Sequence, residues 1–378
     1  MNKRPLGLRT WIEVDKKAIE KNYRVFRSLI PQNTKMMAVV KSNAYGHGLL
    51  DFSREISALG VDWLGVDSII EGLSLRRASI NTPILVLGST LPEMLLSAAE
   101  NNISLAVSNF EILTEIESLK FKNALRVHIK IDSGMHRHGF VEKDMQMVMK
   151  SLKKLKGKIE VEGLFTHFAA AKNPDLLAST KEQLNIFKKW IKVFKDESFN
   201  PIVHAAATGG IMTYPDSALD MVRVGIGLYG LWPSRETKEH LKGKIQLVPA
   251  MSWKTVVSEI KNFPKGSRFG YDFSGVVSRD SKVAVCPVGY WHGYGRGLSG
   301  IGPVLVNGFE GRVLGRVSMD IIIVDVTDVP AIKVGDEVVL LGKSGKLEVS
   351  AEYLAMIQDG WWYEFVTRIN PLIKRIYR

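Results

Sequence analysis

Residues 36–66 read MMAVVKSNAYGHGLLDFSREISALGVDWLGV: an apolar run, a polar turn, a helix-length amphipathic segment and a second apolar run. Short apolar runs are typical of strands buried on both faces, and a helix between two of them indicates a parallel crossover. The same alternation continues to residue 225 and predicts eight strands. Their ranges are 36–40, 63–66, 84–87, 104–107, 125–131, 159–164, 202–206 and 221–224.

Eight β/α units of this length predict a closed (β/α)8 TIM barrel over residues 15–240. The sequence then changes to short β-rich runs joined by Gly, Pro, Asp and Asn turns, which predicts a mainly antiparallel β domain over 241–378. Residues 1–14 contain a strand-like segment that we expect to pair with this domain. The predicted helices are 16–30, 49–59, 69–79, 91–100, 110–120, 142–155 and 179–196, and the later β runs are 252–260, 282–287, 303–306, 312–314, 321–326 and 337–341.

The 378 residues have an ordinary globular composition, 46% hydrophobic and 24% charged, which excludes a disordered or collagen-like chain. Cys286 is the single cysteine, so an intrachain disulfide is excluded and a cytoplasmic location is expected. No apolar run reaches the ~18 to 20 residues of a membrane span, and the first ten residues lack the apolar core of a secretion signal. We therefore expect neither membrane insertion nor export.

The formal net charge of +12 is unusual and could attract nucleic acid or another anionic partner. Lysines gather in residues 150–158 and 188–195. Apolar residues recur at helical spacing from Leu184 to Phe194, so the lysines of the second run are expected on the outer face of a helix. This pattern is typical of a surface helix, and we expect no nucleic-acid or membrane partner.

Polar residues lie at the carboxyl ends of the predicted strands, where the active site of a (β/α)8 barrel forms. Lys41 follows the first strand, Lys130 lies in the fifth and Arg223 in the eighth. A lysine in such an apolar setting is costly to desolvate unless it is paired or neutral, and neutral lysine is the form that makes a Schiff base. His167 follows the sixth strand, and His204, in the seventh, is interpreted as structural.

Glycines after the eighth strand, in Gly225-Ile-Gly-Leu-Tyr-Gly230, match a dinucleotide-binding pattern. That interpretation needs a strand ending in an acidic residue about 20 residues further on, and the sequence has none. The glycine amides better suit the phosphate site that often follows strands 7 and 8 of a barrel. Thr208 and Tyr45 add hydroxyl donors. A lysine and a phosphate cradle together predict pyridoxal 5′-phosphate (PLP) as the cofactor.

These motifs, in this order, resemble the alanine racemase family of fold-type III PLP enzymes over essentially the whole chain. The segment AVVKSNAYGHG (38–48) resembles the PLP-lysine signature of the family. The resemblance implies PLP-dependent interconversion of L- and D-alanine, which supplies D-alanine for peptidoglycan, in a homodimer with shared active sites. The other matching segments are HIKIDSGM (128–135), GLFTHF (163–168), MVRVGIGLYG (221–230) and GRVSMD (315–320).

By this resemblance, Lys41 carries PLP and, once the substrate displaces it, acts as acid or base on one face of the substrate Cα. Inversion needs a second acid/base on the other face, which in the family is a tyrosine of the partner subunit. Tyr271 is the candidate. Phe269 competes for this alignment but has no proton to transfer, and Asp272 stands where the family usually has glycine.

The resemblance implies further roles. His167 and Arg223 would lower the pKa of Tyr271, and Arg223 would donate to the pyridine nitrogen, which suppresses transamination and decarboxylation. Arg137 would contact the PLP phenolic oxygen and the substrate carboxylate, and Lys130 resembles a position that is carbamylated in some members. Thr208, Tyr45 and the amides of Gly225 and Ile226 match phosphate contacts, while Met319 and Tyr290 match the partner-subunit wall and entrance, with Asp320 as a supporting residue.

Three departures from the family line the expected pocket: Ala207-Thr208 replaces the common Asn-Ser, Pro371 replaces a tyrosine, and His138 replaces an aliphatic residue. They leave open a racemase that accepts serine or basic amino acids. A non-catalytic PLP-binding barrel is another alternative, but such proteins resemble the barrel alone. We expect no metal, because His136 and His138 lack further ligands at useful spacing.

Overall fold

Two units make up the chain in the computed structural model, which describes residues 7–378. One unit comprises residues 17–44 and 49–249, and the other comprises residues up to Lys16 together with 45–48 and 250–378. Residues 1–6 of the predicted N-terminal segment lie outside the described residues.

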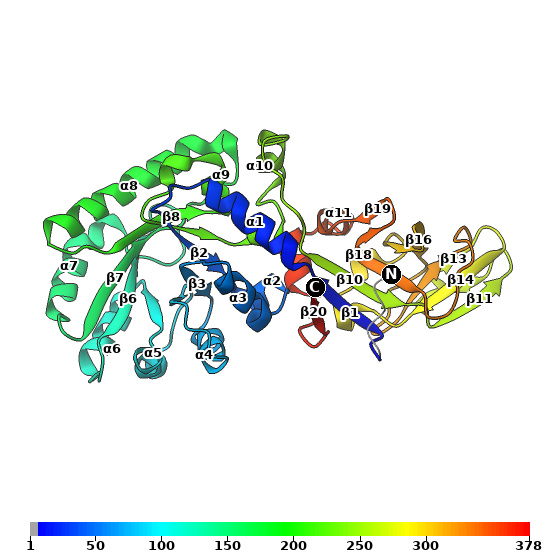
Figure 1. The fold of residues 1–378 in the computed structure, drawn as a ribbon, viewed down its shortest axis with the longest axis horizontal. Helices are drawn as coiled ribbons and strands as arrows, with labels where there is room; N and C mark the ends of the chain where they lie inside the picture. Colours follow the sequence, from blue (N-terminus) through cyan, green and yellow to red (C-terminus); the bar gives the residue numbers. More distant parts are fainter. Residues whose placement is uncertain (1–6) are drawn as a thin grey trace. The chain divides into compact units, whose positions relative to one another are not determined.

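Eight parallel strands close into a barrel in the first unit, in the order β2 to β9 (Figure 1). Pairing between β2 and β9 closes the barrel and sets Met37 beside Arg223. Each strand lies within one residue of its predicted range, so the predicted TIM barrel is confirmed. The strands are β2 Lys35–Val39, β3 Trp63–Val66, β4 Ile84–Val86, β5 Ser104–Val107, β6 Leu125–Lys130, β7 Ile159–Phe165, β8 Ile202–Ala207 and β9 Met221–Val224.

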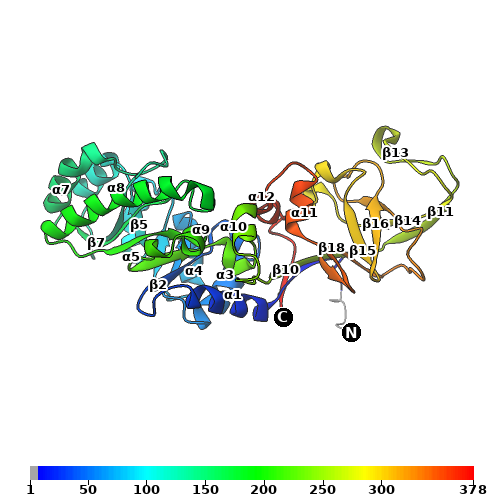
Figure 2. The same cartoon turned by 90° about the horizontal axis from the view of Figure 1, so that it is seen from above.

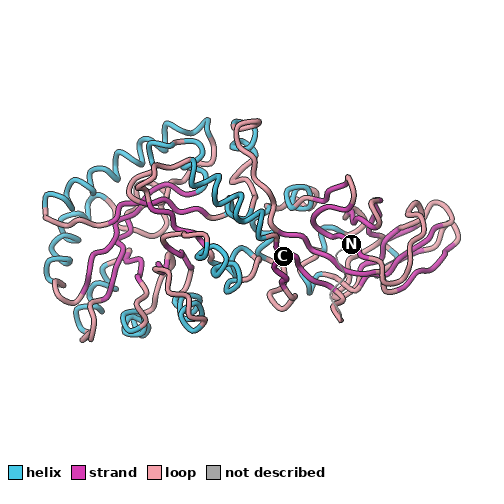
Figure 3. The backbone as a smooth tube through the Cα atoms, in the orientation of Figure 1, coloured by secondary structure: helices cyan, strands magenta, loops and turns pink. Residues whose placement is uncertain are grey.

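Helices lie outside these strands, as Figures 2 and 3 show. Ser68 and Glu71 form a capping box that starts α4. On α8, Leu184 is buried and the lysines of residues 188–195 are exposed, as the spacing predicted. The helices are α1 Lys16–Ser28, α2 Lys41–Tyr45, α3 Leu49–Ala58, α4 Ile69–Arg77, α5 Leu95–Glu100, α6 Phe110–Ser118, α7 Met145–Lys154, α8 Leu177–Asp196, α9 Thr208–Thr213 and α10 Arg235–His240; 3-10 turns η1 Pro92–Met94 and η2 Glu142–Asp144 begin the predicted segments 91–100 and 142–155.

The second unit contains a mainly antiparallel sheet, as predicted, in the order β11-β14-β17-β16-β15-β18-β10-β1-β20, with β19 beside β18. β1 (Thr10–Val14) pairs antiparallel with β10 and parallel with β20, and its Trp11 is fully buried. The other strands are β10 Met251–Val256, β11 Glu259–Phe263, β12 Arg268–Phe269, β13 Gly275–Val276, β14 Ser281–Cys286, β15 Pro303–Val306, β16 Phe309–Val313, β17 Ile322–Asp325, β18 Glu337–Ser344, β19 Leu347–Val349 and β20 Arg375–Tyr377.

The prediction differs from the structure in one strand run and two helices of this unit, and the short strands β12, β13, β19 and β20 are also absent from it. The run 252–260 is two strands, because β10 ends at Val256 and pairs with β18, whereas β11 begins at Glu259 and pairs with β14. Two helices are absent from the prediction, α11 (Ala351–Met356) and α12 (Trp362–Thr367). Each has fewer than two turns, which is too short for a helical period to show in the sequence.

Gly230 lies where the backbone is left-handed and closely packed, so that a side chain there should destabilise the fold. It has φ +80°, and a Cβ there would lie 1.8 Å from the carbonyl oxygen of Val248. We expect Gly230→Ala to lower the free energy of unfolding by about 3 to 5 kcal/mol, because the left-handed backbone and a backbone clash both oppose a side chain. Urea unfolding followed by circular dichroism measures this loss. The control Gly243→Ala, with φ +76° but nothing within 4 Å, should lose only about 1 to 2 kcal/mol, and equal losses would contradict the clash.

Candidate active site

Four cations gather at the carboxyl end of the barrel strands: Lys41, Lys130, Arg137 and Arg223. His167, which follows β7, lies close enough to all four for their charges to affect its pKa. Burial, together with the positive charge of all four, lowers the pKa of His167 to about 3. His167 is therefore neutral at pH 7, so that of the two residues expected to lower the pKa of Tyr271 only Arg223 carries a charge.

Lys41 begins a left-handed turn. Residues 42–45 all have φ between 49° and 56°, a conformation that costs about 1 to 2 kcal/mol for each residue other than glycine. Carboxylates of the neighbouring β/α unit hold this turn: the Ser42 N–H donates to Glu71 Oε1 at 2.7 Å, and Lys41 Nζ donates to Asp67 Oδ1 at 2.8 Å. The S-x-x-E capping signature that ends in Glu71 is visible in the sequence, but nothing in it relates this glutamate to Lys41.

The last residues of the chain hold the far end of the turn, within the second unit. Arg375 Nε donates to the carbonyl oxygen of Gly46 at 3.0 Å, and the Tyr377 hydroxyl donates to that of His47 at 3.0 Å. Gly46 has φ +83°, which continues the left-handed path. Nothing in the sequence marks Arg375 as a partner of this turn.

Arg223 is buried, and two of its guanidinium nitrogens are bonded. Nη1 donates to His204 Nδ1 at 2.8 Å. Nη2 donates to the carbonyl oxygens of Thr166 and Ala205 at 2.7 and 2.8 Å. Nη2 also lies 3.3 Å from His167 Nδ1. Burial lowers the pKa of Arg223 to about 9, so it stays charged at pH 7. Nε makes no hydrogen bond to any residue between 7 and 378. This free donor fits a contact with the pyridine nitrogen of PLP.

Lys130 and Arg137 flank a loop built around Asp132. The Asp132 carboxylate accepts backbone N–H bonds from residues 134–137 at 2.9 to 3.1 Å. Lys130 Nζ lies 5.7 Å from the ring centre of Phe165 and has no hydrogen-bond acceptor among the described residues. Burial and neighbouring cations lower the pKa of Lys130 to about 8. A fraction of the Lys130 amine is therefore uncharged, and so reactive, near neutral pH.

Thr208 and Gly225, both expected at the phosphate, bond to each other. Thr208 begins α9, and its Oγ1 accepts the Gly225 N–H at 3.0 Å. Gly225 precedes η5 (Ile226–Tyr229), whose first N–H groups have no intrahelical partner. The Thr208 hydroxyl and the Ile226 amide are therefore the available donors, whereas the Gly225 amide is already engaged.

The second unit presents the other predicted residues on exposed loops. Tyr271, Tyr290 and Met319 have exposed fractions of 70%, 41% and 55%. Backbone hydrogen bonds join the Tyr290 loop to the Met319 loop, and Asp272, next to Tyr271, forms an ion pair with Arg316. These contacts bring three predicted residues onto adjoining loops of one unit.

Asp272 occupies a position that favours glycine. It has φ 57°, which glycine adopts without cost and aspartate tolerates better than most residues. This accounts for the glycine of the family pattern and for its replacement here. Asp320 Oδ1 lies 3.8 Å from His292 Nδ1. The Tyr45 ring centre lies 6.2 Å from that of Tyr363, and its contact with a phosphate stays a prediction.

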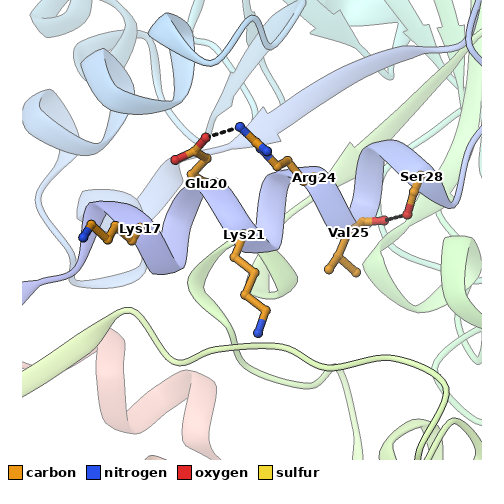
Figure 4. Close-up of a pocket in the computed structure, with 6 residues that line it drawn as sticks. All are labelled: Lys17, Glu20, Lys21, Arg24, Val25 and Ser28. Atoms are coloured by element: carbon orange, nitrogen blue, oxygen red, sulfur yellow. Dashed lines mark hydrogen bonds and ion pairs between the residues drawn. The ribbon is translucent and has the colours of Figure 1, made fainter.

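A pocket of about 470 Å³ lies elsewhere, along α1 (Figure 4). All of its lining residues belong to that helix, Glu20 pairs with Arg24, and none is a predicted site residue. Among residues 7–378, no three or more His, Cys, Asp or Glu side chains are placed to hold a metal ion. None of the helices that the structure describes is both long and apolar enough to cross a membrane.

A closed barrel with a lysine and a cluster of cations at its mouth is typical of a PLP-dependent barrel enzyme. The model of the alanine racemase N-terminal domain matches residues 14–233, and that of the alanine racemase C-terminal domain matches residues 250–377. The chain belongs to the alanine racemase family.

Known alanine racemases are similar to this chain over nearly its full length. The alanine racemase of Methanococcus maripaludis is 38% identical over 97% of this chain and 98% of its own, and alanine racemase 2 of Bacillus subtilis is 37% identical over 97% and 94%. The crystal structure of alanine racemase from Bacillus anthracis with bound L-Ala-P superposes with a TM-score of 0.93 at 34% identity and covers 99% of this chain and 96% of that one. The predicted isomerase activity and PLP dependence are confirmed.

Neutral His167 predicts a pH-dependent stability. Its pKa of about 3 lies below the ordinary value of 6.5, so between pH 6.5 and 3 the unfolded chain binds a proton that the folded, PLP-free chain does not. Stability should therefore fall as the pH falls through this window. His167→Gln removes the contribution, so the wild type should lose more unfolding free energy than the variant, measured by urea unfolding across the window. His136→Gln, whose histidine is 85% exposed, is the control; a pH-independent difference for His167→Gln would contradict the prediction.

Proposed function

We propose that the chain interconverts L- and D-alanine by a two-base mechanism, in a cytoplasmic homodimer with shared active sites, and supplies D-alanine for peptidoglycan. The observation that carries this proposal is the gathering of four cations around neutral His167 at one barrel mouth. Such a concentration of positive charge suits ligands that bring a phosphate and a carboxylate. Family membership adds a small amino acid as the substrate class.

The residues of the barrel mouth fit PLP. Lys41 supplies the amine for covalent attachment, and Arg223 Nε–H would donate to the ring nitrogen. Because a guanidinium keeps its proton at neutral pH, that nitrogen would remain unprotonated. The phosphate would be held by the Thr208 hydroxyl, the Ile226 amide and Tyr45, with Gly225 acting through its bond to Thr208.

Two residues exchange the α proton. PLP withdraws electrons from an attached amino acid and makes that proton acidic. Lys41 Nζ and the hydroxyl of Tyr271 of the partner subunit would lie on opposite faces of Cα, so that one removes a proton while the other delivers one. Cα loses one proton and gains one, and its configuration inverts. Arg137 would bind the substrate carboxylate in a bidentate contact. The partner subunit's Met319 and the partner subunit's Tyr290 would form the wall and the entrance of the site, with Asp320 as a supporting residue.

Racemisation assays on variants test the shared site. With PLP, the wild type should racemise L-alanine faster than L-serine or L-lysine, and faster turnover of either alternative would overturn the alanine assignment. Lys41→Ala and Tyr271→Phe should each lose at least about a thousandfold in kcat, because each removes one of the two acid/base groups.

Mixing the two inactive variants provides the sharper measurement. A heterodimer contains one site with both substitutions and one site with neither, so activity should return to about a quarter of the wild-type level after subunits exchange at random. Mixing Lys41→Ala with Lys41→Met is the control and should restore nothing. If Lys41→Ala and Tyr271→Phe do not complement, Tyr271 acts within its own subunit or not at all.

We also propose that Lys130 is carbamylated. The neutral amine adds to CO2 and releases one proton, and the resulting anion would offset the three neighbouring cations. Burial and these cations lower the pKa of the amine to about 8, which supports the proposal. Protein equilibrated with 13C-labelled bicarbonate should show a carbamate carbon resonance that Lys130→Gln abolishes. Lys143→Gln, an exposed lysine, is the control. A wild-type spectrum without this resonance would contradict the proposal.

A further inference from the structure

Four side chains extend the contacts of Arg223 through the barrel interior. Arg223 Nη1 lies 2.8 Å from His204 Nδ1, His204 Nε2 lies 2.9 Å from His128 Nδ1, and His128 Nε2 lies 3.4 Å from Glu162 Oε2. Ser104 Oγ donates to the same carboxylate oxygen at 2.5 Å. The five residues come from the neighbouring strands β5 to β9. Hydrogen bonds therefore connect the guanidinium of Arg223 with His128, and the series ends where His128 Nε2 approaches the Glu162 carboxylate at 3.4 Å without the geometry of a hydrogen bond.

The chemistry of its two ends fixes the direction of every bond in this series. His128 and His204 are fully buried, which lowers the pKa of both, so each ring is neutral and has one donor and one acceptor nitrogen. Arg223 can only donate, so His204 Nδ1 accepts and its Nε2 carries the proton. That proton is donated to His128 Nδ1, which leaves the His128 proton on Nε2, facing a carboxylate that only accepts. Both histidines are therefore Nε2–H tautomers.

The barrel is built to accommodate this series. A Cβ at Gly163 would lie 2.0 Å from His128 Nδ1, so glycine there makes room for the ring. Trp63 packs edge-on against His128 with ring centres 5.2 Å apart, and Phe165 stacks on His204 at 4.9 Å. Apolar residues of similar volume can replace a buried polar network without loss of stability. The polar series is thus better explained by its end at Arg223 than by core filling.

We propose that Glu162 and His128 are positioning residues for Arg223: the nearby carboxylate reinforces the tautomers that Arg223 favours in both histidines, and so helps to keep His204 Nδ1 as the acceptor that holds Nη1 and leaves Arg223 Nε free. Without that acceptor, His128 can move its proton to Nδ1. His204 then carries its proton on Nδ1, donor faces donor at Arg223, and the guanidinium loses its anchor. Only the final step, from Nε to PLP, rests on the proposed function.

Histidine NMR on the PLP-free protein tests the tautomers directly. Two-bond 15N–1H correlations should show the Nε2–H form for both histidines in the wild type, and the Nδ1–H form of His204 in the wild type would overturn the proposal. Glu162→Leu should shift His204 toward Nδ1–H, whereas Glu162→Gln, which keeps an acceptor oxygen, should not. Glu160→Gln is the matched control, because Glu160 lies on the same strand with an exposed carboxylate paired with Arg126.

The holoenzyme gives the functional measurement. Glu162→Leu should raise the Kd for PLP and lower kcat by about tenfold each, the effect of one lost hydrogen bond, with little change in KM for alanine. Glu162→Gln and Glu160→Gln should stay near wild type. Equal losses in Glu162→Gln and Glu162→Leu would overturn the proposal, because charge and not bond direction would then matter.

The two proposals can fail separately. If the wild type binds PLP but does not racemise alanine, the proposed function fails, while the tautomers and the Kd for PLP still decide the positioning role. If Glu162→Leu does not fold, His128→Phe, which keeps a ring against Trp63, takes its place. It should show the same rise in Kd, and an unchanged Kd would overturn the proposal.

Discussion

Like-charge repulsion among the four cations of the barrel mouth is the constraint on which the rest of the site depends. Together with burial, which is the larger cause, it lowers the pKa of His167 and of the Lys130 amine and keeps His167 neutral. The aromatic ring of Phe165 lies 5.7 Å from Lys130 Nζ and 5.4 Å from Arg223 Cζ, where its negative face attracts both cations. A site assembled in this way favours ligands that bring negative charge with them, and it binds them by relieving repulsion as well as by making contacts.

Hydrogen bonds from two distant parts of the sequence stabilise the strained backbone after Lys41. The left-handed turn after Lys41 is held at its start by Glu71 and at its end by Arg375. Neither residue touches the amine itself. Backbone conformations of this cost persist only where the surroundings determine them, and they cluster at functional sites. The conformation of the turn after Lys41 therefore depends on residues outside the signature that contains it.

The sequence was sufficient for the barrel because each strand is a short apolar run that ends in polar or glycine residues. It also located Lys41 and Arg223, since chemistry in a barrel belongs at strand ends. It was not sufficient for Glu162. In the strand IEVEGLF both glutamates alternate with apolar residues, so the sequence pattern is the same for each. Only the register shift between β6 and β7 beside His128 distinguishes Glu162 from Glu160. The contacts of His204 with His128 and Arg223 have no sequence signal either, because the three residues are remote from one another in the chain.

Closure of the barrel sets the order in which the active site can form. Arg223 lies in the last strand and Lys41 follows the first, and the two approach each other only when β9 pairs with β2. A chain that is still being synthesised, or one that has folded only part of its barrel, lacks the cation cluster altogether. The complete cluster therefore requires the closed barrel, in which β2 and β9 pair with each other and neither is left as an open edge of the sheet.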